Sequence, residues 1–221
     1  MAQTNGGVHP IIQAERQRQA TRPGLAVRGT FSPSERRRPA AGALLARTLC
    51  TNRESQIMAR LIIVTGPTGV GKTTYSLSLS KDIEAVRFSI DPWMQNLFSK
   101  DMTSLDYAWM IERVNRCYVQ IWQVSEQILK LDGNVVLDLG FTTREQRGHF
   151  TALAKELGAK SEVHYLSAPK DVRKKRVEKR NVEKDPSVYS FEVTDFMFNF
   201  MEPKYEVPDE QELANGRVVN A

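Results

Sequence analysis

The sequence is poor in cysteine and has no long apolar run, and each of these features excludes a class of protein. Its 221 residues include only two cysteines, Cys50 and Cys117, too few for a disulfide framework or a cysteine-rich metal site. No apolar stretch approaches the length of a membrane-spanning helix, and we expect no secretory signal. We therefore expect a cytoplasmic protein with no membrane association, built on one α/β core.

Basic charge is concentrated near the N-terminus. The formal net charge is +5, and residues 1–57 contain nine arginines, no lysine and three glutamates. Those residues carry +6, so the rest of the chain carries −1. A basic protein suggests nucleic-acid binding, but here the near-neutral charge of residues 58–221 argues against it.

Residues 1–57 have scattered Pro, Gly, Arg and Gln and no sustained helical or strand period, which predicts a disordered basic extension. Three interpretations compete: a nucleic-acid-binding arm, an organelle-targeting peptide, or translated sequence upstream of the true start. We favour the third because Met58 stands immediately before the first predicted strand. We expect residues 58–221 to form one domain that is a monomer or a weak homodimer.

A strand and a glycine-rich loop follow Met58. Four apolar residues at 61–64 predict a buried strand of a parallel sheet. The next residues fit G-x-x-x-x-G-K-[ST], in which glycines let backbone N–H groups point at a phosphate. Lys72 would reach the β- and γ-phosphates and Thr73 would ligate Mg²⁺. The expected nucleotide-binding residues are Gly66, Pro67, Thr68, Gly69, Val70, Gly71, Lys72, Thr73 and Thr74.

An accidental Gly-rich turn is the alternative reading of this loop. The strand before it and the helical pattern at 74–81 after it argue against that reading. Further strands are predicted at 85–90, 134–140, 161–166 and 217–219, and helices at 105–131, from Thr142 or Thr143 to 157, at 170–181 and at 191–201. This alternation predicts a three-layer α/β/α fold with a mostly parallel five-stranded sheet and a short helical lid.

Two aspartates stand at predicted strand ends, where ligands of open parallel sheets collect. Asp138 ends the third strand and would hold Mg²⁺ together with Thr73, directly or through water. Asp91 follows the second strand and could accept or align the proton of an acceptor hydroxyl. A strand-end cap or turn is the alternative role of Asp91.

Arginines cluster on the predicted helix 170–181. Arg173, Arg176 and Arg180 share one face and would contact the phosphates of ATP. A run of charges more often forms a solvent-exposed helix face, so we expect only one or two of the three to touch phosphate. Arg144 follows the third strand, within plausible reach of substrate. Arg147 lies one turn later and could equally be on the surface.

Three absent patterns narrow the reaction. No Asn-Lys-x-Asp follows the fourth strand, which disfavours guanine-specific recognition. Leu139 follows Asp138 where hydrolytic ATPases usually have a second acid, and no small helical domain is evident. Transfer of the γ-phosphoryl group to an acceptor remains, with ATP and Mg²⁺ as cofactors.

The motifs taken together resemble the kinase-like P-loop ATP-binding proteins often named "AAA family ATPase" or "AAA domain", whose relatives include chloramphenicol phosphotransferase, polynucleotide kinase and zeta toxins. They are the loop at 66–74, Ser89-Ile-Asp91, Val135–Phe141 with Arg144 and Arg147, and Arg173, Arg176 and Arg180-Asn181. The resemblance implies that Asp91 acts as the base toward an acceptor hydroxyl and that lid arginines contact phosphate.

One departure from that family concerns the acceptor. Polynucleotide kinases and zeta toxins place an arginine shortly after the base, whereas residues 92–96 contain none. Trp93 and Met94 suggest a more apolar acceptor. We expect a small-molecule phosphotransferase with Lys72, Asp91 and Arg176 as catalytic residues and Asp91, Trp93 and Arg144 at the substrate. The alternatives are a regulatory or toxin-like protein that acts through a partner, and a nucleic-acid end-processing kinase.

Overall fold

Five strands form the centre of the fold in a computed structural model that describes residues 58–101, 106–186 and 188–221. The described residues all belong to one compact unit. The predictions for residues 1–57, and the expected helix start at Leu105, lie outside the described residues.

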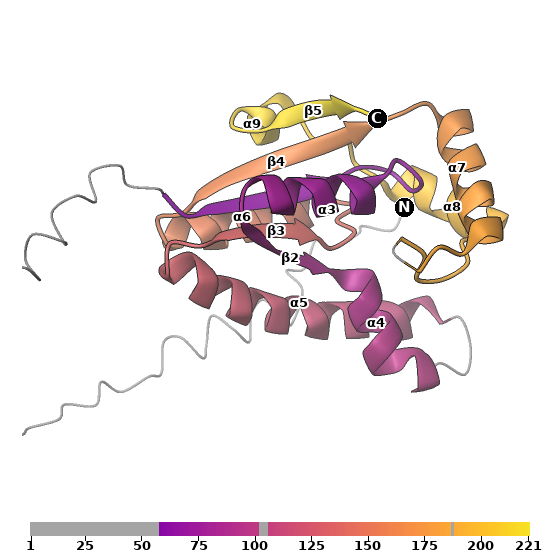
Figure 1. Ribbon diagram of the computed structural model, residues 1–221, viewed down its shortest axis with the longest axis horizontal. Coiled ribbons are helices and arrows are strands. Elements are labelled where there is room, and N and C mark those ends of the chain that lie inside the picture. The colour runs from indigo at the N-terminus through magenta and orange to yellow at the C-terminus, as the bar shows by residue number, and fades with distance from the viewer. Residues whose placement is uncertain (1–57, 102–105, 187) are drawn as a thin grey trace, which may run out of the picture. The chain divides into compact units, whose positions relative to one another are not determined.

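The sheet is parallel throughout, with the strand order β2-β3-β1-β4-β5 (Figure 1). Its strands are β1 (Arg60–Thr65), β2 (Ala85–Ser89), β3 (Asn134–Asp138), β4 (Lys160–Ser167) and β5 (Arg217–Asn220). The predicted α/β fold and its five strands are confirmed, and the sheet is entirely rather than mostly parallel. The central strand β1 is buried from Leu61 to Thr65, as its apolar sequence predicts.

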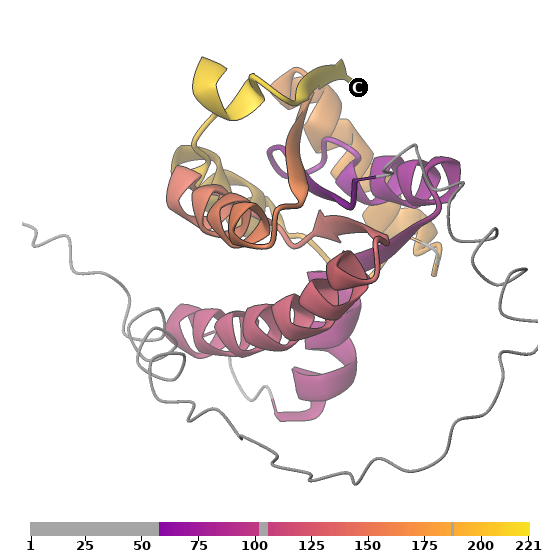
Figure 2. The ribbon, with the colours of Figure 1, turned by 90° about the vertical axis from the view of Figure 1, so that its left-hand side faces the viewer.

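Helices cover both faces of the sheet. Ile62, Val64 and Val136 point to the face that α3 covers, where Leu79 packs against them. Side chains of α5 and α6 pack on the opposite face. Figure 2 shows the ribbon of the long α5 on that side of the sheet. The helices are α3 (Lys72–Asp82), α4 (Ile90–Phe98), α5 (Tyr107–Lys130), α6 (Arg144–Glu156), α7 (Lys170–Glu183), α8 (Asp195–Met201) and α9 (Glu210–Leu213), with 3-10 turns at Ser99–Asp101 and Glu202–Lys204.

Several element boundaries differ from the sequence-based expectation, and two of the differences have a clear local cause. The second strand ends at Ser89, and Ile90 begins a helix, α4, that the sequence did not lead us to expect. Pro92 fits the first turn of this helix, where its missing N–H costs no hydrogen bond. The last long helix was expected from residue 191 but α8 begins at Asp195, because the Thr194 side chain accepts a hydrogen bond from the Met197 N–H and so caps it.

A buried histidine links β4 to α3. His164 is fully buried, with Nδ1 2.9 Å from the Tyr75 hydroxyl and Nε2 3.3 Å from a Glu162 carboxylate oxygen. A neutral imidazole satisfies both contacts if Tyr75 donates to Nδ1 and Nε2–H donates to Glu162. Burial lowers the pKa of His164, and the hydrogen bond to Glu162 opposes that effect. The folded protein therefore resists protonation of this side chain.

We expect this histidine to make the fold sensitive to mild acid. As the pH falls below about 6.5, the unfolded chain gains a proton at His164 that the folded chain does not bind, so the free energy of unfolding falls by up to about 1.4 kcal/mol per pH unit. Urea unfolding at pH 7.5 and pH 5.5 measures this slope. His164→Gln should show a smaller slope than the parent protein, and equal slopes in the two proteins would contradict the prediction.

Candidate functional site

The loop between β1 and α3 has the backbone geometry of an anion-binding loop. Gly69 and Gly71 have φ angles of +80° and +100°, which residues with a Cβ rarely adopt. A Cβ at Gly69 would lie 2.6 Å from the Arg173 carbonyl oxygen on α7, so the glycine also permits a close approach of the two segments. All nine residues predicted to bind nucleotide, 66–74, lie in this loop and the first turn of α3.

The N-terminus of α3 has backbone donors available for a ligand. Its N-cap is Gly71, no side chain caps it, and its first turn contains no acid. By contrast, side chains cap α5, α6, α8 and α9. An uncapped helix N-terminus that follows a glycine-rich loop fits a phosphate group, because both its N–H groups and its dipole favour an anion.

Lys72 lies at this helix start, as the motif requires. Its ammonium donates to the carbonyl oxygens of Gly66 at 2.7 Å and Pro67 at 3.2 Å. Burial lowers the pKa of Lys72, and the charges of Asp138 and Asp91 oppose that effect. The structure thus brings Lys72 into electrostatic contact with both aspartates that the sequence singled out.

Asp138 ends β3 and is held by two neighbours. Its Oδ2 accepts a hydrogen bond from Ser76 at 3.0 Å and an ion pair from Arg87 at 2.6 Å. Oδ1 makes no hydrogen bond within the described ranges. The sequence analysis did not identify Ser76 and Arg87, although Arg87 gave a signal, since a charge within a predicted strand of a helix-covered sheet needs a partner.

Asp138 and Thr73 suit a divalent cation of the Mg²⁺ type. Both offer oxygen ligands, and Mg²⁺ in nucleotide sites is usually held by one or two protein groups together with phosphates and water. No group of three or more His, Cys, Asp or Glu side chains forms a metal site in the part of the chain that the structure describes. The donor set therefore fits a cation that arrives with a nucleotide.

Asp91 lies in the first turn of α4, at the carboxyl end of β2. The α4 N-cap is Ser89, and no side chain caps that helix, which removes the capping role considered for Asp91. Its half-buried carboxylate makes no hydrogen bond to any residue that the structure describes. Burial raises the pKa of Asp91, the charge of Asp138 adds to the rise, and Lys72, Arg180 and Arg87 oppose it.

Two aromatic side chains bear on the predicted substrate side of the site, and one of them, Tyr118, feels the charge of Asp91. Trp93 is partly buried against the core, with its ring edge-on to Phe88 at 6.5 Å between centroids. The Tyr118 hydroxyl donates to the Leu139 carbonyl at 2.7 Å, and the pKa of Tyr118 is raised by burial and by the charge of Asp91. Substrate contact by Trp93 stays a prediction.

Arg173 anchors α7 to the loop. Its guanidinium forms a two-pronged ion pair with Glu202 at 2.6 and 2.9 Å and donates to the carbonyl oxygens of Thr68 and Ala168. Arg173 is buried, and these three neighbours already occupy its donors. This arrangement makes it a support of the loop, and a direct contact with phosphate stays a prediction.

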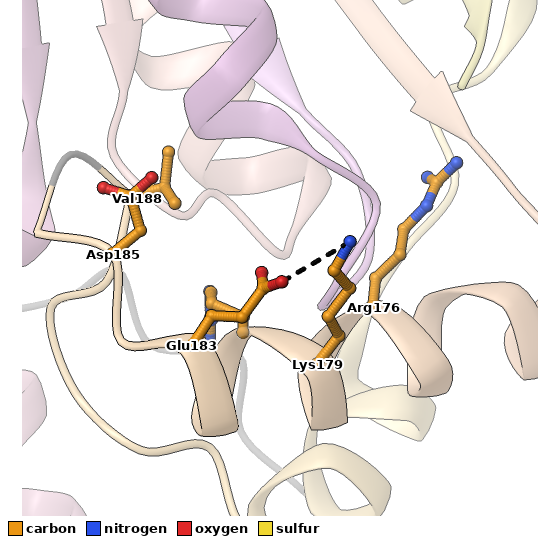
Figure 3. A pocket seen from close by; sticks show the side chains of 6 residues that line it. Arg176, Lys179, Glu183, Asp185 and Val188 are labelled. Atoms are coloured by element: carbon orange, nitrogen blue, oxygen red, sulfur yellow. Dashed lines mark ion pairs between the residues drawn. The ribbon is translucent and has the colours of Figure 1, made fainter.

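Arg176 and Arg180 are better placed to reach a ligand. Arg176 donates to the Val70 carbonyl oxygen of the loop at 3.4 Å, a long hydrogen bond. Arg180 acts on the pKa values of both Lys72 and Asp91, and its buried Nε has no hydrogen-bond partner in the part of the chain that the structure describes. A pocket lies between the C-terminal half of α7 and the segment that follows it (Figure 3), lined by Arg176, Lys179, Arg180, Glu183, Asp185 and Val188.

Arg144 and Arg147, on α6, bind the C-terminal segment. Arg144 pairs with Asp209 and donates to Gln211 at 3.1 Å. Arg147 is fully buried in an ion pair with Glu212, at 2.7 and 3.0 Å, which rules out the surface position that the sequence left open for it. Apolar patterning could not distinguish these cases because an arginine is buried only when its partner is close in space. A substrate role for Arg144 stays a prediction.

Comparisons agree with this geometry. A family model described as "AAA domain" matches residues 61–203. A "putative kinase" from Chloroflexus aurantiacus has a similar structure, with a TM-score of 0.57, 16% identity, and coverage of 74% of this chain and 88% of that chain. Kti12 from Chaetomium thermophilum, in complex with ADP-AlF3, has a TM-score of 0.56, 17% identity, and coverage of 72% and 88%.

Two further findings concern absences. The chain has no match among the curated proteins. Among the described residues, none of the helices has both the length and the apolar character needed to cross a bilayer.

Proposed function

Since this chain belongs to the AAA domain family and has a kinase-like P-loop fold, we propose that it is a Mg-ATP-dependent phosphotransferase that acts on a hydroxyl of a small molecule. The ADP-AlF3 complex of the structurally similar Kti12 supports a nucleotide as the ligand of the glycine-rich loop. We also propose a cytoplasmic protein that works as a monomer or a weak homodimer.

One observation carries the proposal: the Asp91 carboxylate makes no hydrogen bond to residues 58–101, 106–186 or 188–221, which the structure describes. It lies at the same edge of the sheet as the loop and shares its electrostatic surroundings with Lys72 and Arg180. An acid without a hydrogen bond and with a raised pKa fits a proton acceptor better than a structural role. A hydrolase, whose acceptor is water, usually has a second acid directly after the residue that corresponds to Asp138. Leu139 stands there in this chain, which favours transfer to another acceptor.

Each residue of the site has a defined task in this reaction. Asp91 accepts the proton of the acceptor hydroxyl while that oxygen bonds to the γ-phosphorus and the bond to the bridging oxygen of ADP breaks. Lys72 stabilises the negative charge on the β- and γ-phosphates, assisted by Arg176 and Arg180 from α7. Asp91 then returns its proton to solvent, and ADP and the phosphorylated product leave.

Thr73 and Asp138 would hold Mg²⁺ in this scheme. The ion, when bound, neutralises charge on the phosphate oxygens. Asp138 has its Oδ2 occupied by Ser76 and Arg87, so Oδ1 is the oxygen left for the cation or for one of its water molecules.

A screen of acceptors tests the proposal. The full-length protein is incubated with Mg-ATP and, in turn, hydroxyl-bearing antibiotics, nucleosides and sugar-nucleotides, and ADP release is recorded. We expect one class to stimulate ADP release and to yield a phosphorylated product by mass spectrometry. A protein that binds ATP yet phosphorylates no member of these classes would contradict the small-molecule acceptor.

The alternative of action through a partner protein is favoured by one surface feature. Phe196 and Phe200 of α8 stack at 5.8 Å between ring centroids and are 75% and 38% exposed. Exposed apolar side chains in a cluster are typical of interaction sites. In that case ADP release would stay unchanged across the acceptor screen.

A further inference from the structure

Arg87 is a partly buried cation in the middle of β2 that the proposed reaction does not use. Its side chain is 15% exposed, and its Nη2 lies 2.6 Å from Asp138 Oδ2. Its Nε donates to the Ser76 hydroxyl at 2.7 Å, and that hydroxyl has two acceptors for its one proton, the same Asp138 oxygen at 3.0 Å and the Thr73 carbonyl oxygen at 3.0 Å. The three side chains form a closed ring of hydrogen bonds.

The register of the sheet explains why these residues meet. Arg87 pairs with Val136, and Ser89 pairs with Asp138. Because side chains alternate along a strand, Arg87, Val136 and Asp138 point to one face, which is the face that α3 covers. Ser76 lies on the second turn of α3, one turn after Thr73, so the ring joins α3, β3 and β2 directly beneath the phosphate loop.

The ring fixes one oxygen of Asp138 and leaves the other available. Arg87 and Ser76 both bind Oδ2, while Oδ1 has no hydrogen bond among the described residues. A carboxylate held at one oxygen by two donors cannot rotate freely, so the direction of its second oxygen is also set. Partners that orient a metal ligand in this way strongly affect metal affinity.

We propose that Arg87 is a positioning residue that orients Asp138 toward the divalent cation bound with the nucleotide. This inference rests on the proposed function, since it requires a cation to bind with ATP. The positive charge of Arg87 opposes a nearby cation, so charge alone would make its removal favourable to Mg²⁺ binding. The inference therefore predicts a result opposite to that of simple electrostatics.

The test compares ATP affinity with and without Mg²⁺ in the full-length protein, by calorimetry. In the parent protein Mg²⁺ should tighten ATP binding. In Arg87→Met we expect this gain to shrink by about tenfold, the lower end of the effect of a lost metal-orienting partner. Ser76→Ala removes the other donor to Oδ2 and should reduce the gain in the same direction but less.

A matched control is available on β1. Arg60 is a partly exposed arginine whose Nε lies 3.5 Å from Glu162, at the opposite end of the strand from the loop. Arg60→Met should keep the full gain from Mg²⁺. If Arg87→Met does not fold, Arg87→Lys and Ser76→Ala carry the same test, because each weakens the ring without removing the charge of residue 87.

The outcomes separate the two proposals. A gain from Mg²⁺ that is unchanged or larger in the folded variants overturns the positioning role of Arg87 and leaves the proposed function intact. Failure of the parent protein to bind ATP overturns the proposed function and this inference together.

Discussion

Replacing Asp91 with asparagine is expected to slow phosphoryl transfer by about 10²–10⁴-fold, the range of a lost general base. The variant keeps the size of the side chain but cannot accept the proton of the acceptor. ATP affinity should change little, because Asp91 makes no hydrogen bond to the loop. Single-turnover transfer to the acceptor identified by the screen measures the first quantity, and calorimetry measures the second.

The same substitution should stabilise the fold. Burial raises the pKa of Asp91, which means that the folded protein disfavours its ionised form. A neutral asparagine removes that penalty, so the midpoint of thermal unfolding at pH 7.5 should rise. A carboxylate that merely capped a helix would leave the midpoint near the parent value, because asparagine caps about as well as aspartate, so a rise in the midpoint separates the two roles.

Asp106→Asn is the matched control for this experiment. Asp106 is an exposed aspartate that also stands at a helix start, where it caps α5 by accepting the Ala108 N–H at 2.9 Å. Asparagine caps helices about as well as aspartate, so both stability and activity should stay near the parent values. Transfer by Asp91→Asn at the parent rate would refute the assignment of Asp91 as the base.

Replacing Lys72 with methionine is expected to lower transfer by about 10²–10³-fold, the cost of losing one charge-stabilising donor. Methionine has a similar length and cannot donate to a phosphate. Affinity for ATP should fall as well, since Lys72 is the one cation that the motif places against the β- and γ-phosphates. Single-turnover transfer and calorimetry measure the two effects.

Lys81→Met provides the comparison for Lys72. Lys81 is an exposed lysine in the last turn of the same helix, α3, remote from the loop. Its replacement should leave ATP affinity unchanged. Equal losses in both variants would indicate a general loss of positive charge, and no loss in Lys72→Met would contradict the role of the loop.

Regular local patterns made most of the fold predictable. A continuous apolar run predicted the central strand, and the glycine spacing predicted the loop and the start of α3, because these signals depend on neighbours in the sequence. Thr143 was one of two candidate caps for α6, and it closes a capping box with Gln146. The helix α4 escaped prediction since Asp91-Pro92 is compatible with either a strand end or a first helical turn.

The arginines show where prediction from sequence reached its limit. Arg173, Arg176 and Arg180 lie on one helix face and have the same chemistry, yet their surroundings differ. Arg173 is bound to Glu202 and two carbonyl oxygens, whereas the Nε of Arg180 has no hydrogen-bond partner among the described residues. The residue that decides the difference, Glu202, lies 29 positions from Arg173 in the chain. Spacing along a helix shows which face a side chain occupies but not which groups lie opposite that face.

The sequence by itself determined the layered α/β class, the phosphate loop and the two aspartates at strand ends. Each of these follows from short-range rules of backbone geometry and from the way parallel strands end at one edge. Only the tertiary structure decided that Asp91 has no hydrogen-bond partner among the described residues and that Arg87 and Ser76 hold Asp138. Burial and ion pairing depend on residues that the chain brings together from distant positions, so their energies cannot be assigned before the fold is known.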